Sequence, residues 1–294
     1  MTTLQVSATH LEIIRYYEEA GLDYGAWSPA FNMHFGYWRP GMNPFRLEPM
    51  LEQMNEEVFR RLQLPPGSEP LVLDAGCGLS AASRHLAKAL PGAQFYGVTI
   101  TPWQIDFGEK LNAEAGLSDR IRLLEADFHD LPLPDACADA AFCLESACYG
   151  DGDGKERLVR EIARVLKPGA RFVVADGFRN HPNPLPHWLD RIYRRAMDCW
   201  ALQDFAEIHS FEKSLKKAGF TDIRVEDILW QLAPSVAHVP KTALKFFWRR
   251  LWETDRKPLT QERLNNTIAP LLSMAMGLAR KHFSYRIVSA VRDE

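Results

Sequence analysis

The stretch EPLVLDAGCGLSAASRHLAKAL, residues 69–90, decides the fold class of this chain. Its first half is a short apolar run that ends at Asp74, Gly76 and Gly78, and its second half repeats alanine and leucine at helical spacing. A buried strand that passes through a tight glycine turn into a helix is typical of parallel sheets. Glycine lets a ligand approach the backbone closely, because it has no Cβ.

Strand and helix alternate in the residues that follow this stretch. Four more strands are predicted by apolar runs at 94–100, 121–127, 139–146 and 167–178. Amphipathic stretches at about 102–115 and 154–167 predict helices between them, and runs at 222–229 and 283–292 predict two last strands. The sequence therefore predicts an α/β fold, with a seven-stranded Rossmann-like mixed sheet and helices on both faces.

Three segments stand outside this alternation and are rich in large apolar side chains: 1–65, 181–207 and 232–281. We expect them to form a mostly helical, composite lid over the ligand-binding edge of the sheet. The cofactor-binding core is then made of 66–180, 208–231 and the last strand at 282–294. Ordinary packing of these helices on the sheet is the alternative, and the two do not exclude each other.

Composition excludes several classes of protein. The net charge of −3 gives no positive field for nucleic acid. The five cysteines form no CxxC pair, and no His, Cys or carboxylate set has ligand spacing, so neither a disulfide framework nor a metal is expected. Residues 1–21 lack the basic start and apolar run of a signal peptide, and no apolar stretch suffices to span a membrane, so we expect a cytoplasmic protein.

Two kinds of ligand suit the glycine turn, a dinucleotide phosphate and the amino-acid end of S-adenosylmethionine. Gly76, Gly78 and Ala81 satisfy the loose G-x-G-x-x-A pattern of dinucleotide sites. Asp74, however, sits poorly beside a pyrophosphate, and the second strand ends in Val-Thr-Ile-Thr without the acid that binds a ribose. These features favour S-adenosylmethionine, with a nicotinamide oxidoreductase and a non-catalytic binding protein as alternatives.

The segment VLDAGCG, residues 72–78, resembles the first motif of class I S-adenosylmethionine-dependent methyltransferases. Two later segments resemble the next landmarks of that family in order: EADFHDLPLPDACADAAF (125–142) and REIARVLKPGARFVVAD (160–176). Three shorter segments resemble sterol and tocopherol methyltransferases and cyclopropane fatty acid synthases: FNMHFGYW (31–38), GVTITPWQ (97–104) and CLESACY (143–149). The resemblance implies S-adenosylmethionine as cofactor and a small, often lipid-like acceptor.

The resemblance also implies which residues hold the two ends of the cofactor. Asp74, with the backbone of Gly76 and Gly78, is expected to bind the cationic amino end of the methionyl moiety. Asp127 follows the third strand and is expected to accept a hydrogen bond from the adenine amino group. Phe128 is expected to lie along the adenine ring.

The middle of the cofactor is assigned by the same resemblance. Thr99 stands where the family usually has a ribose-binding acid, and a hydroxyl binds ribose more weakly, so Thr101 and Gln104 are expected to help. Tyr37 and Trp38 are expected to close over the sulfonium, because aromatic faces attract cations. Packing inside the lid is the alternative for these two rings.

The acceptor chemistry points to a carboxylate. Methylation of an olefinic carbon leaves a carbocation and then a proton, and one carboxylate can stabilise the first and remove the second. Glu145 follows the fourth strand and is the first candidate, with a salt bridge or a cofactor contact as its alternative; His34 and Tyr149 come next. We expect C-methylation of a small, largely apolar acceptor, isoprenoid-like or another natural product of secondary metabolism. N- or O-methylation and methylation of a prenyl diphosphate are alternatives.

The segment 241–256 predicts an amphipathic helix. Its apolar face consists of Leu244, Phe247, Trp248, Leu251 and Trp252, and its basic residues are Lys241, Lys245, Arg249, Arg250 and Arg256. Four interpretations remain open: core contact with solvated charges, a pocket lid, peripheral contact with a membrane surface, and a basic site for a diphosphate.

Overall fold

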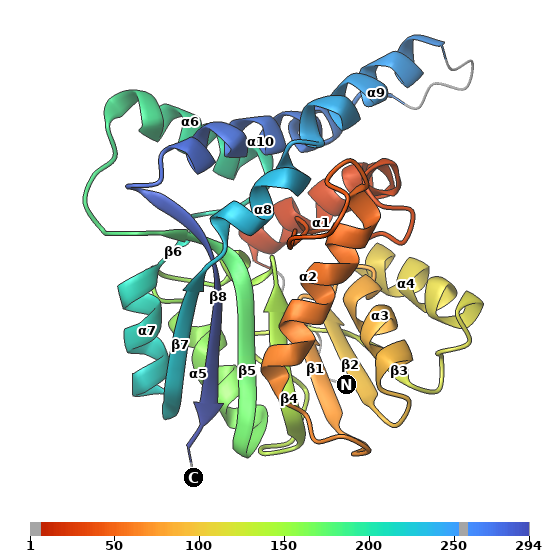
Figure 1. The fold of residues 1–294 in the computed structure, drawn as a ribbon, viewed down its shortest axis with the longest axis vertical. Helices are drawn as coiled ribbons and strands as arrows, with labels where there is room; N and C mark the ends of the chain where they lie inside the picture. Colours follow the sequence, from red (N-terminus) through yellow and green to blue (C-terminus); the bar gives the residue numbers. More distant parts are fainter. Residues whose placement is uncertain (1–6, 253–257, 294) are drawn as a thin grey trace.

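The computed structural model describes residues 7–252 and 258–293. One sheet holds eight strands, seven of them in the order β3-β2-β1-β4-β5-β8-β7 (Figure 1). Their bounds are β1 Leu71–Ala75, β2 Gln94–Thr99, β3 Ile121–Glu125, β4 Ala138–Leu144, β5 Leu166–Arg179, β7 Phe220–Asp227 and β8 Phe283–Arg292. β8 runs antiparallel to β5 and β7, and the other neighbours in this order are parallel. The predicted mixed sheet is confirmed, and β6, Ala206–Glu207, adds a short strand beside β5.

Helices pack on both faces of the sheet, as predicted. One face carries α5 Glu156–Val165 and α7 Ile208–Lys217, and the other carries α2 Leu47–Leu62 and α3 Ala81–Ala89, while α4 Pro102–Glu114 lies beside β2 and β3. Leu158 and Phe211 belong to the apolar core on the first face, and Met54 and Leu86 to the core on the second. Because both faces are covered, the central strands are continuous apolar runs.

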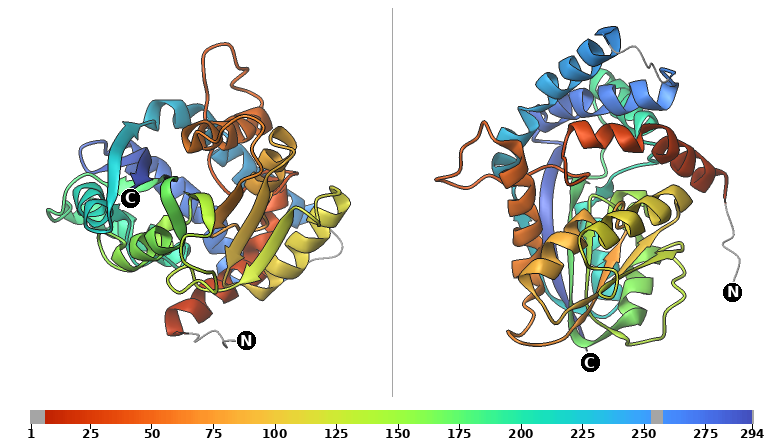
Figure 2. Two further views of the ribbon diagram at one scale, coloured as in Figure 1. Left: turned by 90° about the horizontal axis from the view of Figure 1, so that it is seen from below. Right: turned by 90° about the vertical axis from the view of Figure 1, so that its right-hand side faces the viewer.

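The other helices gather beyond the carboxyl ends of the parallel strands (Figures 1 and 2). They are α1 Ala8–Ala20, the 3-10 helix η1 Gly21–Ala26, α6 His187–Cys199, α8 Leu229–Val236, α9 Val239–Trp252 and α10 Gln261–Leu278. Leu189 and Tyr193 of α6 form a third apolar cluster with Met276 of α10 and Phe283 of β8. This layer therefore has a small core of its own, at the edge where parallel sheets bind ligands.

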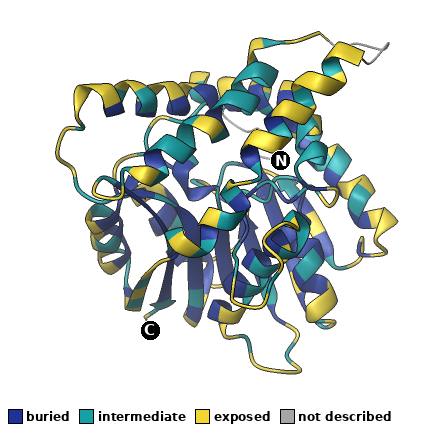
Figure 3. Cartoon of the chain, turned by 45° about the horizontal axis from the view of Figure 1, so that its top comes forward, coloured by how far each residue is buried: buried dark blue, intermediate teal, exposed yellow. Residues whose placement is uncertain are grey.

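The predicted lid segments divide between this layer and the sheet. The helix α2, which belongs to the segment 1–65, packs on the sheet face through Met54 and Val58. Figure 3 shows buried residues along the strands and exposed residues on the outer sides of the helices above them.

None of the described helices is long and apolar enough to cross a membrane. Residues 1–6, 253–257 and 294, with Arg256 among them, lie outside the described residues.

Two predicted boundaries differ by a few residues. The helix predicted over 154–167 ends at Val165, because Leu166 already pairs with Ala138 of β4. The strand predicted over 222–229 covers Phe220–Asp227 instead, since the Asp227 carboxylate accepts the backbone N–H of Leu229 at 3.0 Å and α8 begins there.

Candidate functional site

The glycine turn follows β1 and leads into α3. Gly76 has a φ of 84°, and a Cβ there would lie 2.3 Å from the Cβ of Ser146, so the turn requires glycine. The Gly76 N–H donates to the carbonyl of Val98 at 2.9 Å, so this N–H is not available to a phosphate. A phosphate cradle needs N–H donors, whereas an ammonium group needs acceptors, so this turn suits the amino end of the expected cofactor.

Asp74 supplies a buried carboxyl group beside the turn. The residue is 3% exposed, and its Oδ2 accepts a hydrogen bond from the Ser83 hydroxyl at 2.6 Å. Burial raises the pKa of Asp74 to about 7, although the bond from Ser83 acts in the opposite direction. A cation bound beside this group favours its ionised form, as expected for a carboxylate that binds an ammonium.

A cluster of polar side chains follows β2. The Thr99 hydroxyl donates to Gln104 Oε1 at 2.6 Å and accepts the backbone N–H of Thr101 at 3.2 Å. The Thr101 hydroxyl is buried and has no hydrogen-bond partner among the described residues. A buried hydroxyl without a partner costs free energy, so it indicates a polar ligand group at this position. A ribose hydroxyl fits this requirement.

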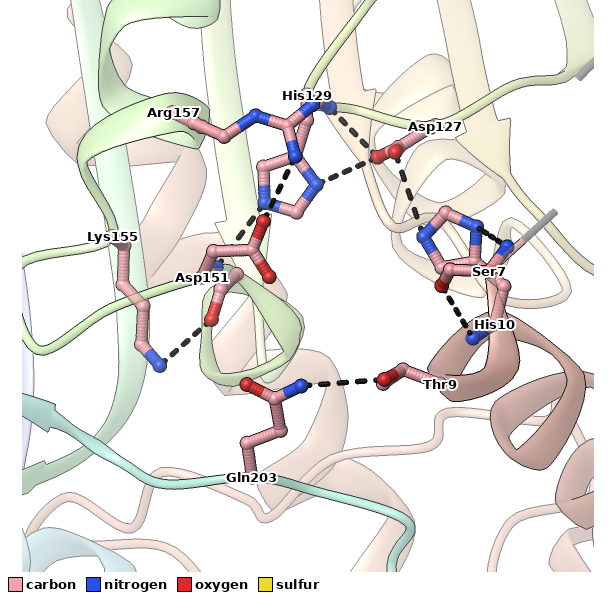
Figure 4. A network of polar contacts seen from close by, with 10 residues as sticks. Ser7, Thr9, His10, Asp127, His129, Asp151, Lys155, Arg157 and Gln203 are labelled. Carbon is pink, nitrogen blue, oxygen red and sulfur yellow. Dashed lines mark hydrogen bonds and ion pairs between the residues drawn. The ribbon is translucent and has the colours of Figure 1, made fainter. Parts of the chain in front are cut away.

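Asp127 lies just after β3 and is held by two histidines (Figure 4). Its Oδ1 accepts the backbone N–H of His129 at 2.9 Å and contacts the Nδ1 of the same ring at 2.8 Å. The His129 Nε2 accepts the backbone N–H of Asp151, so the ring proton is on Nδ1 and points to Asp127. Burial raises the pKa of Asp127, but the His129 bonds outweigh it and hold the pKa below its ordinary value.

The second oxygen of Asp127 faces the helix α1. His10 Nε2 lies 3.5 Å from Asp127 Oδ2, and Ser7 caps the helix and bonds the backbone of His10 (Figure 4). The adenine amino group is expected at this same oxygen. A carboxylate oxygen can accept two hydrogen bonds, so Oδ2 can accept from the adenine amino group beside His10.

These groups line one pocket at the carboxyl edge of the sheet. Eight of the ten predicted cofactor residues are among its walls: Asp74, Gly76, Gly78, Thr99, Thr101, Gln104, Asp127 and Phe128. The three predicted catalytic residues, Glu145, His34 and Tyr149, line it as well. The helix α1 closes the pocket with His10, Ile13 and Tyr17. The carboxylates, the orphan hydroxyl and the bare glycine turn fit S-adenosylmethionine.

Tyr37 and Trp38 lie elsewhere, and this corrects their expected place over the sulfonium. Neither residue lines this pocket or the cavity beside it. The backbone N–H of Tyr37 donates to Met50 of α2, and that of Trp38 donates to Gln231 of α8. The Tyr37 ring packs against the sheet core. Both residues join the N-terminal segment to neighbouring helices, while Tyr17 and Tyr149 are the tyrosines that line the pocket.

Glu145 occupies the boundary between two cavities. Its φ of 52° is in the left-handed region, which is unusual for a residue other than glycine and is often found at functional sites. Its Oε1 accepts the backbone N–H of Phe35 at 2.7 Å and the Tyr285 hydroxyl at 2.9 Å. Burial, together with the charge of Asp176, raises the pKa of Glu145 to about 8. Both described hydrogen bonds end on Oε1, so Oε2 is the oxygen left to bond a ligand.

The second cavity has a volume of about 490 Å³ and lies under α8, α9 and α10. It shares Tyr17, Met33, His34, Glu145 and Tyr149 with the first pocket. Its walls are mostly apolar and include these large side chains: Trp27, Phe35, Trp200, Phe205, Trp230, Phe246 and Phe283. Volume and lining are those of a site for a small apolar molecule.

His34 is positioned less favourably as a base. Its Nδ1 is 2.9 Å from the carbonyl of Phe35, and its Nε2 is 3.2 Å from Asn32 Oδ1. Burial lowers the pKa of His34 to about 4. With both ring nitrogens engaged, the geometry favours a structural role. Tyr149 donates to the carbonyl of Trp200, and burial raises the pKa of its phenol well above the ordinary value, so the phenol stays protonated.

Sequence reasoning missed Asp176, Tyr285 and His10. Asp176 ends the run FVVAD on β5, lines the second cavity, and accepts the backbone N–H of Cys148 at 2.9 Å. Burial raises the pKa of Asp176 to about 6. A lone acid in a buried apolar strand was a signal for Asp176. Tyr285 and His10 had none, because each reaches the site from a distant segment.

The basic residues proposed for a diphosphate lie outside the cavity. None of the four described basic residues of 241–256 lines it: Lys241, Lys245, Arg249 and Arg250. The sequence also offers Arg191, Arg194 and Arg195 as helpers for a diphosphate, but they are exposed on α6 and do not line it either. Among its described lining residues, Arg280 is the sole lysine or arginine, and it stacks on Trp230 at 4.7 Å. The polar end of the cavity carries the carboxyl groups of Glu145 and Asp176, which disfavour a diphosphate.

Comparison with known proteins agrees with this geometry. A family model described as a methyltransferase domain matches residues 73–174. A probable tocopherol O-methyltransferase, chloroplastic, from Oryza sativa subsp. japonica is 30% identical over 259 residues, which are 82% of this chain and 69% of the relative.

Solved structures share the fold over nearly the whole chain. The cyclopropane synthase MmaA2 from Mycobacterium tuberculosis aligns with a TM-score of 0.79 at 16% identity, over 98% of this chain and 99% of that one. The geranyl diphosphate C-methyltransferase from Streptomyces coelicolor A3(2) aligns with a TM-score of 0.73 at 18% identity, over 98% and 99%. At these identities the likeness concerns the fold alone.

Proposed function

The chain belongs to the class I S-adenosylmethionine-dependent methyltransferases, and from this membership we propose that it methylates a carbon atom of a small, largely apolar acceptor held in the 490 Å³ cavity. Membership of this family argues against the nicotinamide oxidoreductase and the non-catalytic binding protein. The acceptor is isoprenoid-like or another natural product. A cytoplasmic location and the lid role of the helices above the sheet are parts of the same proposal.

One observation carries the proposal: the Glu145 carboxyl group lies where the cofactor pocket meets the apolar cavity. Tyr17 and Tyr149 line both spaces beside it, and Tyr24 and Asp176 line the cavity. Carboxylates and aromatic faces stabilise a cation in a space from which water is excluded. Such surroundings suit an acceptor that becomes positively charged during the reaction.

The residues divide the work as follows. When bound, S-adenosylmethionine supplies an electrophilic methyl group on a sulfonium. Asp74 would bind its ammonium group, the Thr101 hydroxyl would bind a ribose hydroxyl, and Asp127 Oδ2 would accept from the adenine amino group. Ionised Glu145 first stabilises the positive charge on the acceptor and then takes the proton from its carbon at Oε2.

A second candidate is O-methylation of a phenol. It is favoured by the name of the rice relative, which is called an O-methyltransferase. Glu145 is also suited to accept a phenolic proton, because its pKa of about 8 lies closer to that of a phenol than an ordinary carboxylate does. In that reaction no carbocation forms, so the carboxylate acts as base only.

One experiment distinguishes the two reactions. The protein is incubated with S-adenosylmethionine labelled with ¹³C in the methyl group and with a panel of isoprenoids and phenols, and the products are examined by NMR. A new methyl signal bonded to carbon supports the proposal, and one bonded to oxygen selects the second candidate. Label on an amine or on no member of the panel would contradict both.

A further inference from the structure

The helix α9 presents an unusual outer surface. Five large apolar side chains are exposed on it by the following fractions: Leu244 70%, Phe247 39%, Trp248 64%, Leu251 66% and Trp252 71%. The Trp248 and Trp252 rings lie 5.8 Å apart and form a continuous aromatic surface. A patch of this kind on a monomer marks a site of interaction rather than ordinary surface.

The charges of α9 are all of one sign. Between Val239 and Trp252 the helix carries Lys241, Lys245, Arg249 and Arg250 and no acidic residue, although the whole chain has a net charge of −3. Lys241, Lys245 and Arg249 follow one another at four-residue intervals and therefore form a stripe beside the apolar face. A helix with aromatic and leucine side chains on one face and basic residues beside it is the type that lies in a membrane interface.

The opposite face of α9 belongs to the acceptor cavity. Val239, Thr242, Ala243 and Phe246 line that cavity, so a single helix separates it from the exposed apolar surface. In Figure 1, α9 extends beyond the rest of the upper layer, with its C-terminal part farthest from the sheet.

The cavity reaches the surface on the neighbouring helices α8 and α10. Trp230 on α8 and Leu278 on α10 line the cavity and are 69% and 87% exposed, so they form an apolar rim. Arg280, which also lines the cavity and is exposed, stacks on Trp230 and adds a positive charge to the rim.

We propose that α9 docks on an anionic lipid surface and that the apolar acceptor passes from the lipid into the cavity over this rim. The Trp and Leu side chains enter the boundary between headgroups and acyl chains, and the lysines face the anionic headgroups. A second copy of the chain is the less favourable occupant. In a two-fold interface Lys241 and Lys245 of both copies would be brought together, and α9 carries no acidic residue between Val239 and Trp252. The uptake of acceptor rests on the proposed function, whereas the docking does not.

The test uses the full-length protein and vesicles, with neither acceptor nor cofactor present. We expect the protein to sediment with vesicles of phosphatidylcholine and phosphatidylserine, to stay in solution with pure phosphatidylcholine, and to be released by salt. The double variant Trp248→Ser/Trp252→Ser should lower binding by roughly tenfold or more, and Lys241→Gln/Lys245→Gln should do so with anionic vesicles. Matched controls are Phe45→Ser, an aromatic residue that is 85% exposed elsewhere, and Lys110→Gln on α4.

Each outcome decides the proposal. Unchanged S-adenosylmethionine affinity by calorimetry shows that the variants are folded, because the exchanged residues lie outside the cofactor pocket. Wild-type protein that stays in solution with anionic vesicles would overturn the docking. So would a dimer in analytical ultracentrifugation that the tryptophan exchanges dissolve, since the second copy would then be the occupant. Failure of methyl transfer with normal vesicle binding would refute the proposed function and leave the docking in place.

Discussion

The Tyr285 hydroxyl donates a hydrogen bond to Glu145 Oε1 at 2.9 Å and joins two residues that are 140 positions apart. Tyr285 comes from β8, the antiparallel strand beside β5, and Glu145 follows β4. Together with the bond from the Phe35 N–H, the Tyr285 bond fixes one carboxylate oxygen of Glu145, and the other oxygen is left to bond a ligand. The predicted base is thus held in a single orientation where the cofactor pocket meets the acceptor cavity.

Exchange of Glu145 should lower turnover and leave the affinity for the cofactor unchanged. Glu145→Gln keeps the shape of the side chain and removes its charge and its basicity, so we expect kcat to fall by roughly 100-fold or more. S-adenosylmethionine affinity, measured by calorimetry, should stay close to that of the wild type. Glu109→Gln, on the exposed side of α4, is the control. If Glu145→Gln turns over at the wild-type rate, another residue is the base. If the variant loses its affinity for the cofactor, Glu145 belongs to the cofactor site.

The pH profile should report the same group. Because burial raises the pKa of Glu145 to about 8, its basic form is scarce at pH 6 and increases until the pH exceeds that value. We expect kcat/KM to rise by about tenfold per pH unit below the pKa and then to level off. The Tyr285 bond lowers the pKa of Glu145, so Tyr285→Phe should shift the rise to higher pH. A rise that persists unchanged in Glu145→Gln would belong to another group, with Asp74 next to test.

The adenine end depends on Asp127. Asp127→Ala removes the acceptor oxygen at Oδ2, and we expect S-adenosylmethionine binding to weaken by roughly 1–3 kcal/mol, the value of one hydrogen bond to a charged group. Calorimetric titration measures the change. The control is Asp130→Ala, an exposed aspartate three positions further along the chain. Equal affinity of Asp127→Ala and wild type would show that the adenine lies elsewhere.

The glycine turn should tolerate no side chain. Gly76→Val places a Cβ against Ser146, and Asp74→Ala removes the carboxylate for the ammonium, so each should abolish calorimetric binding of the cofactor. Gly67→Val is the matched control, because Gly67 has a φ of 73° and nothing within 4 Å of an added Cβ. Asp74→Asn is the second test of the carboxylate, because it keeps the volume of the side chain and so disturbs the fold less than Asp74→Ala. If Gly76→Val and Asp74→Asn both bind normally, the cofactor does not use this turn.

Turnover should need no metal ion. Among the described residues, no group of three or more His, Cys, Asp or Glu side chains is placed to hold one. We expect turnover to be unchanged by EDTA once an acceptor is known. Loss of activity that one divalent ion restores would contradict this prediction and would reopen the diphosphate acceptor.

The sequence alone predicted the sheet, the glycine turn and most of the cofactor pocket. These features have local causes: apolar runs make buried strands, and a glycine is required where the backbone turns under a ligand. Asp74, Thr99 and Asp127 directly follow or end strands that are neighbours in the sheet, and parallel strands bring their carboxyl ends to one edge. These side chains come together because their strands are neighbours in the sheet, so the pattern along the sequence was sufficient to predict the site.

Only the tertiary structure decided which distant side chains complete the site. Tyr285 reaches Glu145 because β8 inserts between β5 and β7, and His10 reaches Asp127 because α1 folds over the edge of the sheet. The same packing moves Tyr37 and Trp38 away from the pocket, toward α2 and α8. No periodicity encodes such meetings, since they depend on how separate segments pack their apolar faces. The raised pKa of Glu145 is equally tertiary, because burial by those segments is its main cause.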